Sequence, residues 1–264
     1  MPRTIVITGA SSGIGEALAL SYARDGSCLG LLGRNIQRLD RTGERCRSAG
    51  AAVSAAAIDV RAHGDMEAWL QRFDDNTPID LLIANAGVMA GSAASNELES
   101  TETARALVET NVLGVMNTIQ PILPRMIARR RGQIAIVSSI AAFLPVPDAP
   151  SYGASKAAVL SYGLALRSLL RSQGIGVSVI CPGYVDTPMM RQEEGSKPSI
   201  MLPDKAAELI RRGLMRDRAV IAFPPMFALV TRIGGMLPDR LRRWTSVPFR
   251  FTVKAYSRTD REPQ

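Results

Sequence analysis

The sequence predicts a doubly wound α/β fold built on a mostly parallel β-sheet. Short apolar runs alternate with longer helical patterns along most of the 264 residues. This alternation is typical of βα units joined by right-handed crossovers. The residues best suited to chemistry follow directly after the apolar runs, where such sheets bind their ligands. No Pro/Gly-rich linker and no internal repeat divides the sequence, so a single domain is expected.

Each strand is predicted from an apolar run of strand length that is followed by a turn or a helical pattern. The first run, Thr-Ile-Val-Ile-Thr, has the character of a buried strand, and the last run is short. The predicted strands cover residues 4–8, 28–32, 53–58, 79–84, 133–138, 176–181 and 219–223.

The helices are predicted between these strands from longer stretches with helical periodicity. They cover residues 14–24, 36–49, 65–73, about 102–129, 151–172 and 203–215, and the second is mostly polar. After the last strand, the apolar run 226–237 is helix-like, although Arg232 and two glycines interrupt it. The sequence therefore predicts a helical C-terminal extension, and we divide the chain into a main domain at 1–224 and an extension at 225–264 that is not an independent domain.

The net charge of +8 lies entirely in residues 211–264, which hold 12 basic and 4 acidic residues. The rest of the chain is balanced, so a dispersed basic surface for nucleic acid is not expected. The three cysteines have no metal or redox spacing, and we expect no metal site and no disulfide framework. With no signal-peptide pattern in the first residues, these features predict a reducing, cytoplasmic location.

A glycine-rich turn joins the first predicted strand to the first helix. Its sequence Thr8-Gly9-Ala10-Ser11-Ser12-Gly13-Ile14-Gly15 has the spacing G-x-x-x-G-x-G. Glycines permit a tight turn and a close backbone approach, and a helix N-terminus presents free N–H groups to a pyrophosphate. The turn therefore predicts a dinucleotide site, with an ordinary glycine-rich turn as the alternative.

Further candidate residues follow the other strands and are expected in the same crevice. They are Arg34 after the second strand, Asp59 after the third, Asn85-Ala86-Gly87 after the fourth, Ser139 after the fifth and Pro182-Gly183 after the sixth. The second strand ends in Gly33-Arg34 and has no acidic residue at its tip. Because an arginine binds a 2′-phosphate and a carboxylate would repel it, we predict NADP rather than NAD, with Arg38 assisting. The alternative is that Arg34 is simply exposed.

Acid/base chemistry points to Tyr152, because the chain has one histidine, His63. Tyr152 and Lys156 are four residues apart, so they share one face of a helix, and Ser139 precedes them by thirteen residues. An ammonium beside a phenol lowers a pKa that starts near about 10, which lets the phenol exchange a proton near neutral pH. A solvated surface pair is the alternative interpretation.

Together these residues resemble the classical short-chain dehydrogenase/reductase family. The resemblance spans roughly residues 4–224 and is specific through the order and spacing of its motifs. They are Thr8-Gly9-x-x-x-Gly13-x-Gly15, Asp59-Val60, Asn85-Ala86-Gly87, Asn111, Ser139, Tyr152-x-x-x-Lys156 and Pro182-Gly183 with Thr187. The resemblance implies a Rossmann-type sheet of seven strands and hydride transfer between NAD(P) and a carbonyl or secondary alcohol.

The resemblance also implies a role for each matched residue. Tyr152 would be the general acid or base, Lys156 would lower its pKa and hold the nicotinamide ribose, and Ser139 would orient the substrate oxygen. Asn111 would hold a water that continues the proton path. Asp59 would accept from the adenine amino group, and Thr187 would meet the nicotinamide carboxamide. The remaining cofactor-binding residues would be Gly9, Ser11, Ser12, Gly13, Ile14, Gly15, Val60, Asn85, Ala86, Gly87, Pro182, Gly183 and Val185.

Residues 143–146 and the loop 188–203 are expected to wall the substrate, and their apolar residues favour an apolar carbonyl or alcohol. The C-terminal extension has three interpretations. It covers the cleft or a subunit interface, it meets an anionic membrane surface through 226–251, or it is partly disordered. No charge-free stretch there reaches the roughly 18 residues that cross a bilayer.

Two other functions compete with an NADP-dependent oxidoreductase. A non-catalytic dinucleotide-binding regulatory protein would not need the full set of Asn111, Ser139, Tyr152 and Lys156. A nucleotide-sugar epimerase or dehydratase is disfavoured by the turn spacing and the short chain after the sixth strand. A peripheral-membrane reductase of a lipid-like substrate is a further alternative. The family resemblance implies a homodimer or homotetramer through the helices near 102–129 and 152–172.

Overall fold

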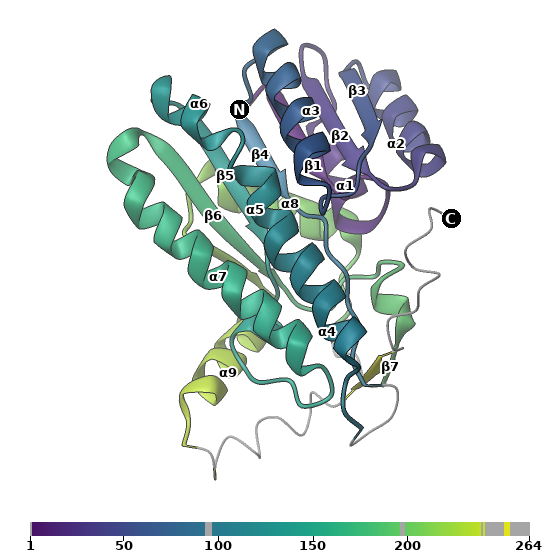
Figure 1. Ribbon diagram of the computed structural model, residues 1–264, viewed down its shortest axis with the longest axis vertical. Helices are drawn as coiled ribbons and strands as arrows, with labels where there is room; N and C mark the ends of the chain where they lie inside the picture. Colours follow the sequence, from purple (N-terminus) through teal and green to yellow (C-terminus); the bar gives the residue numbers. More distant parts are fainter. Residues whose placement is uncertain (1, 93–96, 196–198, 239, 241–250, 254–264) are drawn as a thin grey trace.

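A seven-stranded, wholly parallel sheet forms the centre of the computed structural model (Figure 1). The structure describes residues 2–92, 97–195, 199–238, 240 and 251–253. The strand order is β3-β2-β1-β4-β5-β6-β8, so the direction of winding reverses between β1 and β4. The strands are β1 (Thr4–Thr8), β2 (Cys28–Gly33), β3 (Ala52–Ala57), β4 (Leu81–Ala84), β5 (Gly132–Val137), β6 (Ile175–Pro182) and β8 (Val220–Phe223).

Helices cover both faces of the sheet and make three layers. Alternation along β1 shows the division, because Ile5 and Ile7 face one layer and Val6 faces the other. The first layer contains α1 (Gly13–Tyr22), α2 (Ile36–Ser48) and α8 (Pro203–Met215). The second contains α3 (His63–Asn76), α5 (Gly114–Ile119), α6 (Leu123–Ala128) and α7 (Pro150–Leu170).

The predicted doubly wound fold and its seven strands are confirmed, with strand ends that differ by one or two residues. The single helix expected near 102–129 was wrong. The chain there forms α4 (Thr101–Val108), a π-helical segment η1 (Glu109–Leu113), α5 and α6. Pro121 lies between α5 and α6, where it lacks the N–H that would continue the helix. The π-helical turn around Asn111 had no signal in the sequence.

The C-terminal part forms the helix α9 (Pro225–Met236), which matches the helix-like run 226–237. A small antiparallel sheet was not predicted: β7 (Glu193–Gly195) pairs with β9 (Phe251–Val253). This pairing joins the loop 188–203 to the C-terminal extension. Within the predicted membrane contact at 226–251, residues 239 and 241–250 lie outside the described residues, as does the expected disorder at 257–264.

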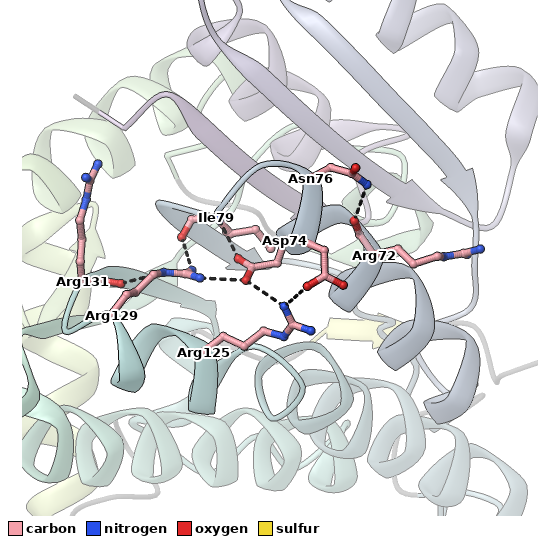
Figure 2. Close-up of polar contacts among 8 residues, drawn as sticks. Arg72, Asp74, Asn76, Ile79, Arg125, Arg129 and Arg131 are labelled. Atoms are coloured by element: carbon pink, nitrogen blue, oxygen red, sulfur yellow. Dashed lines mark hydrogen bonds and ion pairs between the residues drawn. The ribbon is translucent and has the colours of Figure 1, made fainter.

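Asp74 ties the α3–β4 connection to α6 (Figure 2). Its carboxylate is buried and accepts a hydrogen bond from the Ile79 backbone N–H at 2.8 Å. Arg129 donates to the same carboxylate at 2.8 Å and to the Ile79 carbonyl at 2.8 Å. Arg125 bridges Asp74 and Asp75. The network sets the position of β4, whose far end carries part of the site.

Candidate active site

One cavity of about 460 Å³ runs across the carboxyl ends of the sheet strands. Nearly all of the predicted site residues line it, although they come from six separate strand ends and two helices. They are Gly9, Ser11, Ser12, Gly13, Ile14, Arg34, Asp59, Val60, Asn85, Ala86, Gly87, Ser139, Tyr152, Lys156, Pro182, Gly183, Val185 and Thr187. Gly15 and Asn111 lie behind its wall.

The turn after β1 is shaped by glycines at positions where a side chain would be strained or crowded. Gly9 and Gly13 have φ values of 67° and 58°, in the left-handed region. A Cβ atom on Gly15 would overlap the Gly9 carbonyl oxygen, and one on Gly13 would lie 2.9 Å from Thr187 Cγ2. Asn85 donates through Nδ2 to the carbonyls of Thr8 at 2.9 Å and Gly9 at 3.2 Å. The turn thus delivers the N-terminus of α1 to the cavity, which fits a pyrophosphate.

The β2 and β3 ends place a cation and a carboxylate at one end of the cavity. Arg34 and Arg38 are exposed and line it beside Asp59. Arg61, which the sequence analysis missed, donates from Nη2 to Asp59 Oδ2 at 2.6 Å and from Nε to both oxygens at 3.0 Å. Burial raises the pKa of Asp59, but hydrogen bonds from Arg61 and the charges of Arg61 and Arg34 outweigh it and hold the pKa below its usual value. Asp59 is therefore a carboxylate at neutral pH.

Asn111 acts as a buried clamp between η1, the segment after β4, and α7. Its Oδ1 accepts from the Val88 N–H at 2.8 Å. Its Nδ2 donates to the Val88 carbonyl at 2.9 Å and to Ser155 Oγ at 3.0 Å. The residue holds the wall that Val88 and the neighbouring Gly87 form. The water-holding role implied by the resemblance stays a prediction.

Tyr152 and Lys156 lie together at the far end of the cavity from Arg34, near the start of α7. The Lys156 Nζ is 5.8 Å from the centre of the Tyr152 ring and donates to the Val137 carbonyl at 3.2 Å. Burial lowers the pKa of Lys156 to about 8. Burial also raises the pKa of the nearby Cys181 thiol to about 12, so that thiol stays protonated and adds no charge beside Lys156.

Ser139 begins the short helix η2 (Ile140–Ala142) at the end of β5, and its Oγ accepts from the Ala141 N–H at 3.1 Å. This leaves the hydroxyl hydrogen for another acceptor. The adjacent Ser138 instead donates to the Lys156 carbonyl at 2.7 Å and fixes α7 against β5. Because successive side chains along an extended segment point to opposite sides, Ser139 faces the site while Ser138 is buried and structural.

The cavity wall near Tyr152 is apolar. Leu144 and Val146 line it, as do Pro188, Met189 and Met190 from the predicted loop. Phe143 packs instead against the guanidinium of Arg232, 4.5 Å from the ring centre. Met89, Tyr184 and Thr231 of α9 also line the wall and were missed, because nothing in their local sequence signals a distant cavity. The described residues contain no group of His, Cys, Asp and Glu that could hold a metal, and no helix among them could cross a membrane.

The family model described as short chain dehydrogenase matches residues 3–197. The protein belongs to this family. An uncharacterized oxidoreductase of Myxococcus xanthus is 34% identical over 240 residues, which cover 90% of this chain and 94% of that protein. The ketoacyl reductase HetN of Nostoc sp. is 29% identical over 259 residues, covering 93% of this chain and 90% of that one.

Solved structures of the short-chain dehydrogenase family share the fold. A short-chain dehydrogenase from Sphingobium yanoikuyae in complex with NADPH has a TM-score of 0.77 and 30% identity, covering 84% of this chain and 88% of that one. A family member from Burkholderia phymatum in complex with NAD has a TM-score of 0.78 and 27% identity, covering 87% and 92%. The family resemblance is thus confirmed, and this protein is an oxidoreductase that uses a nicotinamide dinucleotide.

Proposed function

We propose that the protein is an NADP(H)-dependent oxidoreductase that transfers a hydride between the nicotinamide and a carbonyl or secondary alcohol. The observation that carries this proposal is the placement of Tyr152 and Lys156 in the same cavity as the glycine-rich turn. The turn would hold the pyrophosphate of a dinucleotide, and Lys156 would hold its nicotinamide ribose. The bound nicotinamide would supply or accept the hydride.

The protein supplies the proton and the electrostatic stabilisation. In reduction, the Tyr152 hydroxyl donates its proton to the carbonyl oxygen, and Ser139 donates a second hydrogen bond that stabilises the developing alkoxide. With a pKa of about 8, Lys156 is mostly protonated at neutral pH. Its charge beside the ring favours loss of the phenolic proton. In oxidation the same groups work in reverse, with Tyr152 as the base.

Replacing Tyr152 with Phe tests this mechanism. The ring and its packing remain, so NADPH should bind within about twofold of wild type, while turnover falls by about a thousandfold or more because the proton donor is lost. Binding is measured by fluorescence titration, and turnover by NADPH absorbance with a panel of apolar ketones. The matched control is Tyr162→Phe, a change on the same helix outside the cavity. Wild-type turnover in Tyr152→Phe contradicts the mechanism.

The NADP preference rests on the β2 end. Arg34 and Arg38 both line the cavity, and no acidic residue occupies the tip of β2. An arginine pair at this position favours the extra 2′-phosphate of NADP. The cavity wall near Tyr152 is apolar, which supports an apolar carbonyl or alcohol as the substrate.

We also propose a homodimer, with a homotetramer as the larger alternative. Val108 and Leu113 near α4 and Leu164 and Leu169 on α7 are exposed apolar residues on helices that pack against each other. Exposed apolar side chains on neighbouring helices are typical of a subunit interface. The catalytic unit is residues 1–224, with 225–264 as its extension. All three cysteines are free, which supports a reducing compartment such as the cytoplasm.

A further inference from the structure

Helix α9 has an apolar outer face in addition to its packed inner face. Ala228, Thr231 and Gly234 face inward and are buried. The outer face carries large apolar side chains with exposed fractions between 46% and 86%; they are Met226, Leu229, Val230, Ile233 and Met236. Their spacing follows one side of the helix. An exposed apolar stripe of this size marks a binding surface.

The inner face holds α9 firmly on the cavity. Thr231 lines the cavity itself. A Cβ atom on Gly235 would overlap the Phe143 carbonyl oxygen, so the two backbones are in close contact. The Tyr184 and Phe227 rings lie 6.1 Å apart. The outer face is therefore presented outward by a fixed helix, at the end of the molecule away from α6 and the N-terminus (Figure 1).

The sequence from α9 onward is basic, which favours an anionic partner. Residues 225–259 hold seven Lys/Arg and one acidic residue, Asp239. Pairing two copies of this face would bring two strongly basic segments together, and their repulsion opposes it. An anionic lipid surface instead complements both features, because it accepts apolar side chains below its headgroups and attracts the arginines.

We propose that the outer face of α9 docks on an anionic membrane surface. The helix has 12 residues, which is too short to cross a bilayer, so it lies in the plane of the interface. Because the opposite face of the same helix walls the cavity, docking places the substrate end of the site against the lipid. Resting on the proposed function, this identifies the substrate class as carbonyls or alcohols that partition into membranes.

Vesicle co-sedimentation of the full chain tests the docking without turnover. Wild-type protein should bind vesicles containing 30% phosphatidylglycerol at least about tenfold better than vesicles of phosphatidylcholine alone, and added salt should weaken this binding. The double variant Leu229→Asp with Ile233→Asp should lose about tenfold or more of it. The matched control is Met215→Asp. Met215 is 50% exposed, close to the 51% of Leu229, and ends α8 before β8 begins, whereas α9 starts after the other end of β8.

Both variants should retain wild-type turnover with a water-soluble ketone, because none of the three changed positions lines the cavity. Equal vesicle binding by wild type and the double variant overturns the proposal. So does a wild-type dimer that the double variant converts to monomer, because the face would then bind a second copy. Loss of vesicle binding by the double variant would support the docking even if the wild-type enzyme were inactive on every ketone. That inactivity would overturn only the proposed function.

Discussion

Lys156 is a buried lysine, and its burial disfavours the charged ammonium form. The residue is 6% exposed, and burial lowers its pKa from 10.5 to about 8. Between these two values the unfolded chain holds a proton that the folded protein has released. The stability contributed by this group therefore increases as the pH rises from about 8 to 10.5, and the cost of burial is fully present below about 8.

Replacing Lys156 with Met should make the protein more stable at pH 7. Removing the buried charge gains roughly 3 kcal/mol, and losing the hydrogen bond to Val137 costs about 1, which leaves roughly 2 kcal/mol. The gain should shrink as the pH approaches 10. Urea unfolding of the cofactor-free protein at both pH values measures it. A variant that is less stable than wild type at pH 7 contradicts the assignment, and turnover should be lost in either case.

Replacing Arg34 with Ala should remove the NADP preference. Losing charge-assisted hydrogen bonds to a 2′-phosphate weakens NADPH binding by about 10- to 100-fold, while NADH binding changes little. Titration with both cofactors measures the ratio. Arg41→Ala is the matched control, because Arg41 lies on the same helix as Arg38 and outside the cavity. An unchanged NADPH/NADH ratio in Arg34→Ala would sink the proposed preference.

The positions of single site residues were predictable where the order of elements or the spacing along one helix determines them. The glycine turn had to lie between a strand and a helix, and Tyr152 and Lys156 had to share a helical face. The Asp59–Arg61 pair and Thr231 were not predictable in this way. The contact of Arg61 with Asp59 depends on the side-chain rotamer of Arg61, which the sequence does not specify. Thr231 lines the cavity only because α9 packs over η2.

At the level of elements, β1, β2, β4, β5 and β6 are mostly buried and are nearly continuous apolar runs, which is why they were found; the edge strands β3 and β8 are less buried but also have few polar residues. The helix near 102–129 was misjudged because its periodicity continues through Pro121, where the backbone cannot. The β7–β9 pair joins two three-residue strands separated by more than fifty residues. Strands this short leave no distinct pattern in the sequence.

The hydrogen bonds of Asp74 should stabilise the α3–β4 connection (Figure 2). Asp74→Ala removes the acceptor for Arg129 and the Ile79 N–H, and should destabilise the protein by roughly 3 kcal/mol. Asp75→Ala is the matched control. Its side chain is 60% exposed, so its loss should cost less than about 1 kcal/mol. Thermal unfolding compares the two, and equal losses would show that the buried pair adds nothing.

For the whole molecule, we expect a dimer of twice the 28.4 kDa chain mass. Light scattering during gel filtration measures it directly. Val108→Asp combined with Leu164→Asp places charges in the proposed interface and should yield monomers. Met215→Asp, exposed on another helix, should leave the mass unchanged. A wild-type protein that elutes as a monomer contradicts the assignment.

The glycine turn after β1 also limits how the enzyme could be redesigned. Its three glycines fit against groups from two other strand ends, Asn85 with Ala86 after β4 and Thr187 after β6, so a new side chain there would disturb several segments together. The β2 end is different, because Arg34 and Arg38 are exposed. An engineer who wants the other nicotinamide cofactor should leave the turn intact and vary only those two arginines.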